Sequence, residues 1–527
     1  SLRITQEQAS QRYPSRQLLR AVATGRQKMP DDPILRAAVE RYLLRFKVKK
    51  GGENVPKNYE IEPAVTLKQV LKEDQMATLS KGTVAQKREF LTSLPAGQVD
   101  DFVVALQQQP RYRGQLFNLA PVALQRKILM VASPEQAIAY DLAVGKLDRA
   151  IYSNRQLQEE LTDFWYNHFN VYLNKGSDRY LVPAYERDAI RPYVLGHFRD
   201  MLEATAKSPA MLFYLDNWQS VAARPANPKR KQPKRGLNEN YGRELMELHT
   251  LGVDGGYTQK DVIEVARCFT GWTIRDVRHG GGFYFNDKVH DKGAKVVLGI
   301  AIPAGGGVED GEKVLDILAH SPATAKFIST KLAQRFVADN PPPVLVARMS
   351  KTFLATNGDL RQVMKAMLDS KEFWSAGAYH AKVKSPFEMI VSSVRALDAD
   401  VDTAFPLVNQ IAQLGEPLYR KQEPTGYSSA NAEWINSAAL LARMNFALAL
   451  AQNRVQGVRV DATKLPAGSS DDPGRIANML LSGGPTPATR TALENVLQKA
   501  VAANPKKPPT PALIAGLVIG SPDFQRR

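Results

Sequence analysis

Apolar residues recur at helical spacing along most of this chain, and this periodicity constrains the fold more than any other feature of the sequence. In several segments they occupy positions i, i+3, i+4 and i+7, with polar residues between them. These segments are 84–94, 157–169, 323–336, 360–373, 386–397 and 438–451. Alternating β-branched runs are scarce, and the best two, 283–285 and 295–300, would form one hairpin across a short loop. The sequence therefore predicts a mainly α protein, a large multi-helical body with at most a small β-hairpin insertion.

The length of 527 residues predicts several structural units or one large helical body. We expect an N-terminal helical extension at 1–80, a helical core at 81–450, and a C-terminal helical segment at 451–527 that packs back on the core. Within the core, residues 220–236 combine six lysines and arginines with three prolines. Because proline blocks helix formation, this stretch is predicted to be a basic loop, either a solvated excursion or an electrostatic flap over an anionic substrate.

The chain carries 70 Lys and Arg against 53 Asp and Glu, a formal net charge of +17. Such a surface favours anionic partners such as acidic glycans, nucleic acid or membrane headgroups. The single cysteine, Cys268, excludes an intramolecular disulfide and every multi-cysteine metal pattern. No stretch approaches the roughly 20 apolar residues needed to cross a bilayer, so we expect no membrane span.

Several motifs of known chemistry are absent. The sequence contains no His-Glu-x-x-His, no Gly-x-Ser-x-Gly and no Walker A motif. It also lacks the Glu-x-x-His tetrapeptide of ferritin-like di-iron sites. We therefore expect no cofactor and no metal; a mononuclear metal site built from Glu244, Glu247, His168 or His249 stays open as an alternative.

The densest cluster of ionisable side chains lies at 238–249. On a helix, Asn240, Glu244 and Glu247 fall on one face, and Arg243 reaches Glu247 one turn on. If that face is buried, desolvation and repulsion between the two carboxylates raise one pKa, which produces a general acid near neutral pH. The alternative is a surface helix on which the charged side chains merely pair.

This cluster supplies the predicted catalytic residues. Glu244 is the predicted general acid, and Glu247 or Asp216 is the predicted base or nucleophile, with Glu239 as an alternate. Asp216 ends the apolar segment 213–217 just before the basic loop, where the ordinary explanation is helix termination.

Aromatic and histidine-containing segments supply the predicted substrate-binding residues. Four aromatic residues and His168 lie within 163–170, so His168 is either a hydrogen-bonded core residue or a ligand-binding group. His290 and Asp291 follow the aromatic run 283–285 and either orient a ligand or form a plain turn. The full predicted set is His168, Trp165, Asn240, Arg243, His249, Trp272, His290 and Asp291.

Several blocks resemble the bacterial DUF1800 family, from about residue 85 to the C-terminus. The blocks are 164–169, 238–252, 256–262, 269–272, 384–388, 434–436 and 521–524, and the stretch 238–272 is the most specific. The resemblance implies a large, mainly helical protein of a group that is often exported and often encoded beside sulfatase-like DUF1501 proteins. It implies no catalytic assignment. A periplasmic or secreted setting agrees with a chain that begins at Ser1 and has one unpaired cysteine.

These features predict an exported, glycoside hydrolase-like enzyme that cleaves an acidic or complex polysaccharide through a carboxylate acid/base pair. The alternative is a non-catalytic helical scaffold or binding protein for an anionic polymer or for an exported partner such as a DUF1501-like protein. Carboxylates that line an open cleft favour the enzyme, whereas carboxylates sealed by arginines favour the scaffold. A metal-dependent hydrolase is a third candidate. Nucleic-acid binding is not expected, because the basic residues concentrate in one Pro-rich loop without interleaved aromatics.

Overall fold

The computed structural model describes residues 2–13, 19, 21–22, 26–50, 65–223, 236–276, 281–466, 472–504 and 509–527. Most of these residues are helical, and β structure among them is confined to three two-stranded sheets. The predicted mainly α, multi-helical fold is therefore confirmed. The basic loop predicted at 220–236 lies for the most part, at residues 224–235, outside the described residues.

The N-terminal helices share a hydrophobic cluster of their own, which includes Ile34, Leu67, Phe102 and Val131. They are α3 (Pro33–Lys50), α4 (Leu67–Val70), α5 (Glu73–Lys81), α6 (Val84–Ser93), α7 (Ala96–Leu106), α8 (Pro110–Phe117) and α9 (Val122–Ala132). Helix α1 (Gln6–Arg12) belongs to a separate small cluster, in which Ala9 and Tyr13 pack with Ala137, Ile138 and Tyr180. This cluster extends across residue 80, and the three-part division of the chain stays a prediction.

A much larger hydrophobic cluster, from Tyr140 to Phe524, holds the remaining helices together. Its first half contains α10 (Pro134–Tyr152), α11 (Gln156–His168), α12 (Asp178–Ala184), η2 (Arg191–Tyr193), α13 (Phe198–Ala206), α14 (Pro209–Tyr214), η3 (Asn217–Gln219), α15 (Asn240–Glu244) and α16 (Gln259–Cys268). Its second half contains α17 (Val308–Ala319), α18 (Pro322–Phe336), α19 (Pro343–Ala355), α20 (Leu360–Leu368), α21 (Pro386–Ala396), α22 (Phe405–Gln413), α23 (Ser437–Ala451), α24 (Gly474–Leu480), α25 (Pro487–Ala503) and α26 (Pro511–Gly520). Three short helices in the same part of the chain, η6 (Asp287–Val289), η7 (Asn431–Glu433) and η8 (Ala462–Lys464), contribute no residue to the cluster.

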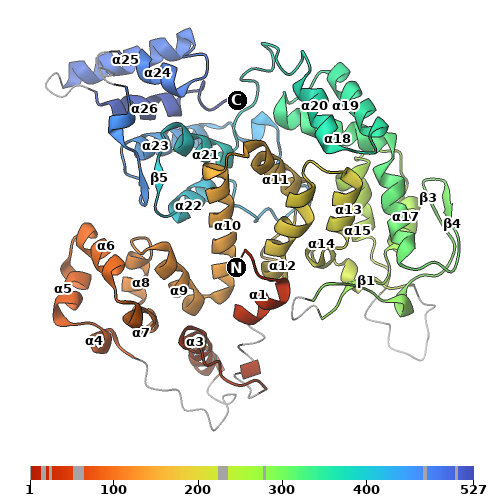
Figure 1. Ribbon diagram of the computed structural model, residues 1–527, viewed down its shortest axis with the longest axis horizontal. Coiled ribbons are helices and arrows are strands. Elements are labelled where there is room, and N and C mark those ends of the chain that lie inside the picture. The colour runs from red at the N-terminus through yellow and green to blue at the C-terminus, as the bar shows by residue number, and fades with distance from the viewer. Residues whose placement is uncertain are drawn as a thin grey trace.

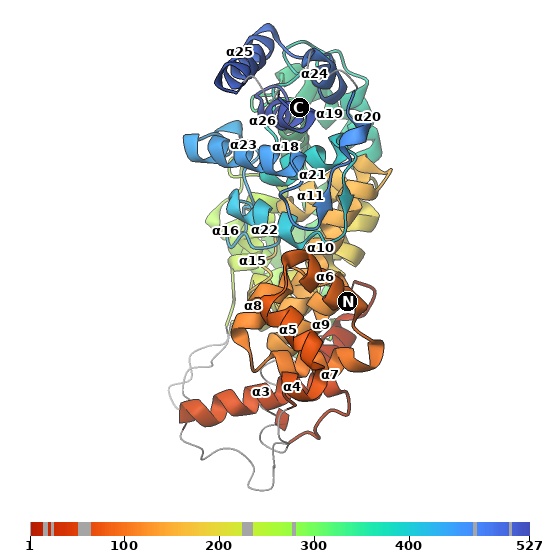
Figure 2. The same ribbon diagram turned by 90° about the vertical axis from the view of Figure 1, so that its left-hand side faces the viewer.

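Helix α10 runs through the middle of the molecule and connects the two clusters (Figure 1). It packs against α9, α12, α21 and α22. Figure 2 shows the N-terminal helices α3 to α7 at one end of the molecule and α24 to α26 at the opposite end. Helix α26 packs along α23, so the last helix lies against the helix three before it in the chain.

Two short stretches widen from α-helix to π-helix: η1 (Tyr185–Ile190) and η4 (Leu245–Thr250). In η4 the amide of Leu251 donates to the carbonyl of Met246, five residues back, at 2.8 Å. The hydroxyl of Thr250 donates to the carbonyl of Leu245 at 2.7 Å, which satisfies another acceptor of the widened turn. Such π turns are rare and recur at functional sites.

The strands form three antiparallel pairs. They are β1 (Trp272–Ile274) with β2 (Phe283–Phe285), β3 (Lys295–Val297) with β4 (Ile300–Ile302), and β5 (Asp400–Val401) with β6 (Val458–Arg459). The prediction that 283–285 pairs with 295–300 is wrong, because each run has another partner. Leu298 and Gly299, with φ of +50° and +79°, form the two-residue turn between β3 and β4. Two successive positive φ values are what a tight hairpin of this kind requires.

Helix ends follow their sequence signals around α16. Thr258 caps the helix, and its hydroxyl and amide both bond to the carboxylate of Asp261 in a capping box. Gly252 has the left-handed φ of +82° expected where the preceding helix ends. Within the described part of the chain, no helix is both long and apolar enough to cross a membrane. No three His, Cys, Asp or Glu residues of that part are grouped so as to hold a metal ion.

Candidate functional site

Segments that lie far apart in the sequence meet around one internal cavity, here called the central cavity. Its walls come from the end of α11, the start of α21, the loop 416–429 and the last residue of the chain, Arg527. Three of the blocks that resemble the DUF1800 family contribute to it: 164–169, 384–388 and 434–436. The central cavity has a volume of about 40 Å³, which is room for on the order of three water molecules.

Arg335 joins three carboxylates beside this cavity. Its Nη2 lies 2.9 Å from Glu160 Oε2, 3.1 Å from Asp163 Oδ2 and 3.0 Å from Glu388 Oε1. Lys146 adds a second cation to Asp163, with Nζ 2.6 Å from Oδ1. Burial raises the pKa of Asp163, but Lys146 and Arg335 outweigh it, and the pKa is lowered overall. Asp163 is therefore ionised at neutral pH.

Glu388 is held in the same way. Its Oε1 lies 2.9 Å from Nη2 of Arg527, and its Oε2 accepts the amide of Ser385 at 2.8 Å, which closes the capping box of α21. Burial raises the pKa of Glu388, while Arg335 and Arg527 lower it, with a net decrease. Glu388 is thus a second buried, ionised carboxylate with cation partners.

Glu416 differs from both. It is 6% exposed, lines the central cavity, and accepts the amide of Phe387 on Oε2 at 2.8 Å. No described Lys, Arg or His lies within ion-pair distance of its carboxyl group. Burial and the charge of Asp163 raise the pKa of Glu416 to about 7. Glu416 can therefore hold or release a proton near neutral pH.

The loop that carries Glu416 is fixed by asparagines from the end of α11. Asn170 donates to the carbonyls of Lys421 and Glu423, at 3.0 and 2.9 Å. Gly426, with φ of +70°, lies so close to Asn167 that a Cβ there would stand 2.2 Å from the Asn167 carbonyl oxygen. A side chain at this position is excluded by both backbone conformation and space.

A second cavity, here called the side cavity, shares its wall with the central one. The shared residues are Asn167, Tyr427, Ser428 and Ser429. The side cavity has a volume of about 260 Å³ and is also lined by His168 and Lys331.

The structure brings the predicted residues His168 and His249 together. His168 Nε2 lies 3.1 Å from the backbone carbonyl of His249, which can only accept, so Nε2 carries the proton. Burial and then the nearby Lys331 lower the pKa of His168 well below its ordinary value. The ring is therefore neutral, and its buried Nδ1 is an acceptor without a partner. Burial and Lys331 likewise lower the pKa of His249 to about 3.

The predicted carboxylate pair lies on a half-buried face. Burial, and then the charge of Glu247, raise the pKa of Glu244, while Arg243 lowers it less. Burial and repulsion between the two carboxylates, the causes predicted from the sequence, therefore both act on the pKa of Glu244. Glu247 accepts a long hydrogen bond, 3.4 Å, from the hydroxyl of Tyr257.

Arg243 does not reach Glu247 as predicted. Its Nη2 pairs with Glu239, one turn back, at 3.3 Å, and donates to Gln259 at 2.8 Å. Side chains of a helix lean toward its N-terminus, which favours the earlier partner, and η4 widens the turn that carries Glu247. Asn240 is exposed and donates to the carbonyl of Leu215 at 3.3 Å.

Three other predicted site residues do not join the carboxylate pair. In the described part of the chain, no direct side-chain contact connects that pair with Asp216, Trp165 or Trp272. Asp216 has φ of +60° and pairs with Lys175 at 2.8 Å, at the turn that follows α14. Trp165 and Trp272 are both 0% exposed and pack in the large hydrophobic cluster. Neither ring offers a free face to a sugar in this conformation.

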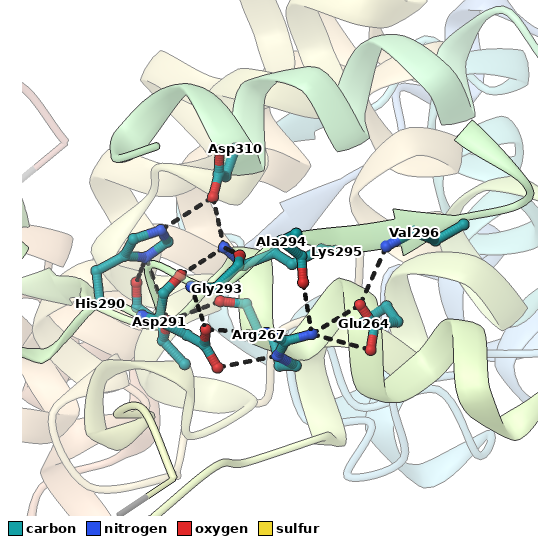
Figure 3. A network of polar contacts seen from close by, with 10 residues as sticks. Glu264, Arg267, His290, Asp291, Gly293, Ala294, Lys295, Val296 and Asp310 are labelled. Carbon is teal, nitrogen blue, oxygen red and sulfur yellow. Dashed lines mark hydrogen bonds and ion pairs between the residues drawn. The ribbon is translucent and has the colours of Figure 1, made fainter. Parts of the chain in front are cut away.

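His290 and Asp291 belong to a closed polar network between α16, α17 and β3 (Figure 3). His290 Nε2 and Lys295 Nζ both meet Asp310 Oδ2, at 3.1 and 2.6 Å. Arg267 holds Asp291 with two hydrogen bonds, of 2.9 and 3.0 Å. These contacts join β3 to the two helices and use the polar groups that a ligand would need.

Sequence reasoning missed Glu416, Arg335 and Lys331. Glu416 and Lys331 stand in no motif, and Arg335 reads as one charge on an amphipathic helix. The available signal was Asn167 and Asn170, since two amide side chains beside an aromatic run that is predicted to be buried need partners in another segment.

The comparisons with known proteins find a sequence family to which the chain is similar. The sequence model of a family described as "protein of unknown function (DUF1800)" matches residues 7–526, which is nearly the whole chain. No curated protein and no solved structure matches. The chain therefore belongs to the DUF1800 family.

Proposed function

We propose that the protein is an exported hydrolase that cleaves an acidic or complex polysaccharide by acid/base catalysis, with Glu416 as the acid. The observation that carries the proposal is the contrast between Glu416 and its neighbours. Asp163 and Glu388 are paired with cations, whereas Glu416 faces the central cavity with a pKa raised to about 7 and no cation partner among the described residues.

A carboxyl group whose pKa lies near the working pH can donate and regain a proton in each turnover. Asp163, kept ionised by Lys146 and Arg335, is the proposed base of the pair. Carboxyl groups whose surroundings push their pKa values apart are the arrangement that glycosidases use.

The central cavity admits water but is too small for a sugar ring. The bond to be cleaved must therefore lie at its wall, beside the exposed Ser428 and the half-buried ring of Tyr427. The net charge of +17, counted over the whole chain, favours an acidic polymer as the partner. The proposed export to the periplasm or medium, and a DUF1501-like exported partner, rest on the resemblance to the family alone.

The test is incubation with a panel of bacterial and plant polysaccharides, with released fragments read by mass spectrometry. Glu416→Gln keeps the shape of the side chain and removes the proton, so we expect a loss of about 10²–10⁴-fold in rate. Glu433→Gln, at an exposed position in η7, is the matched control and should keep the parental rate. Parental turnover by Glu416→Gln would refute this assignment.

The pair Glu244 and Glu247 is the rival source of acid and base, since the pKa of Glu244 is raised as well. Glu244→Gln is therefore measured in parallel. A loss of activity in Glu244→Gln but not in Glu416→Gln would move the reaction to α15 and η4.

A non-catalytic scaffold for an anionic polymer or an exported partner is the second candidate. It is favoured by Arg335 and Arg527, whose guanidinium groups seal Glu388 and leave little free space beside it. Saturable binding of an anionic polymer without any released fragment would favour this role.

A further inference from the structure

The side cavity contains a cation without a counter-ion. Lys331 projects from α18, and its Nζ lies 5.6 Å from the ring centre of Phe327. No described carboxylate lies within ion-pair distance of the Lys331 ammonium group. Burial lowers the pKa of Lys331. An unpaired, half-buried lysine in a cavity wall is costly unless an anion joins it.

The charged neighbours do not neutralise Lys331. His168 is neutral, as argued above, and adds no negative charge. Asp339, the carboxylate in the same wall, is occupied by Lys382 and by the amide of Asn431, the latter at 2.9 Å. The positive charge of Lys331 is therefore available to a ligand.

The rest of the wall combines hydroxyl and amide groups with aromatic faces. Gln334, Thr425 and Ser428 supply the polar groups, and Phe164 and Tyr427 supply the rings. The buried Nδ1 of His168 is an acceptor without a partner, and a ligand hydroxyl or a water would satisfy it. The set suits a ligand with one negative charge, several hydroxyls and an apolar ring face.

We propose that the side cavity binds a single uronic acid residue, with the sugar carboxylate on Lys331 and its hydroxyls on the polar groups of the wall. This inference rests on the proposed function and names its substrate class, an acidic polysaccharide that contains uronate. Lys331 supplies a single positive charge, which matches the single negative charge of a uronate carboxylate. The shared wall residues Asn167 and Tyr427 would then connect the bound uronate to the side of Glu416.

The test is calorimetric titration of the full chain with D-galacturonate, D-galactose and L-lactate. We expect galacturonate to bind and the other two compounds to bind at least about tenfold more weakly. Galactose lacks the carboxylate, and lactate lacks the hydroxyl-bearing sugar ring. Equal binding of galactose would overturn the role of the carboxylate. Equal binding of lactate would overturn the sugar specificity. Binding of an oligogalacturonide but not of the monomer would overturn the single-residue site.

Variants locate the site. Lys331→Gln is expected to weaken galacturonate binding by about tenfold or more, since it removes a charged hydrogen bond. Lys326→Gln, at an exposed position on the same helix, is the matched control and should bind like the parent. If Lys331→Gln does not fold, Gln334→Leu tests the same wall and should weaken binding severalfold. Unchanged binding in the folded variant would refute the site.

The two proposals fail separately. Glu416→Gln should keep galacturonate binding while losing cleavage, since Glu416 does not line the side cavity. Cleavage without galacturonate binding would remove only the uronate site. Galacturonate binding that depends on Lys331, without cleavage of any polysaccharide, would remove only the hydrolase.

Discussion

Asn167 binds the backbone of Tyr427 through both ends of its carboxamide. Its Oδ1 accepts the amide of Tyr427 and its Nδ2 donates to the carbonyl of the same residue, each at 2.7 Å. These two hydrogen bonds resemble those between paired residues of an antiparallel sheet, except that one partner is a side chain. It fixes the wall that the central and side cavities share.

Asn167→Ala is therefore expected to affect both cavities at once. The loss of two hydrogen bonds should lower the free energy of unfolding by about 1–3 kcal/mol, measured by urea denaturation. Galacturonate binding and polysaccharide cleavage should both fall. Asn174→Ala is the control, because the described structure shows no hydrogen bond of the Asn174 side chain. Parental binding and cleavage in Asn167→Ala would contradict the importance of this wall.

The raised pKa of Glu416 makes stability depend on pH. Because the folded pKa, about 7, lies above the ordinary value of 4.5, the carboxyl stabilises the fold below about pH 4.5, and this contribution is lost as the pH rises through 7. The full difference corresponds to roughly 3 kcal/mol. Urea denaturation at several pH values should show this decline in the parent and not in Glu416→Gln. Parallel pH curves for the two proteins would contradict it.

Arg335→Met should be strongly destabilising. It leaves Asp163 and Glu388 buried with fewer cation partners, and breaking a buried pair costs about 3–5 kcal/mol. Arg348→Met, which removes a partner of Glu372 near the surface, is the comparison and should change stability little. Similar free energies of unfolding for the two variants would show that the network around Arg335 is not a main support of the fold.

Asp178 is 0% exposed, and neither carboxyl oxygen has a hydrogen-bond partner within the described part of the molecule. Burial, with a further contribution from Asp216, raises its pKa well above the ordinary value of 3.8. Its stabilising contribution is therefore complete only below about pH 3.8 and is lost as the pH rises. Asp178→Asn should raise the melting temperature at pH 7 and leave it nearly unchanged at pH 3.5; an equal change at both pH values would exclude titration as the cause.

Local signals in the sequence were sufficient for the helical architecture. The Thr258 and Asp261 capping box and the left-handed Gly252 lie where their residue types indicate, because both depend on neighbours within a few residues. The partner of strand 283–285 was not predictable in the same way. It pairs with 272–274, and this choice depends on how the tertiary fold brings the two segments together.

The candidate site depends on long-range contacts. Glu416 is in a loop without periodicity. Its raised pKa comes first from burial by other segments and then from the charge of Asp163, which is far away in the sequence. The sequence left two interpretations of His168 open, a core residue or a ligand-binding group, and the structure shows features of each. It is hydrogen-bonded to His249 and also lines a cavity.

The π turn at η4 has a consequence for insertions and deletions. A π turn holds about one residue more than an α turn, so deletion of one residue between Leu245 and Thr250 would let the segment relax to a regular α-helix. The residues after the turn would keep their direction around the helix axis, because the wider turn absorbs the extra residue. A one-residue deletion should therefore be tolerated better here than in the regular helix α11, where every later residue would rotate by about 100°.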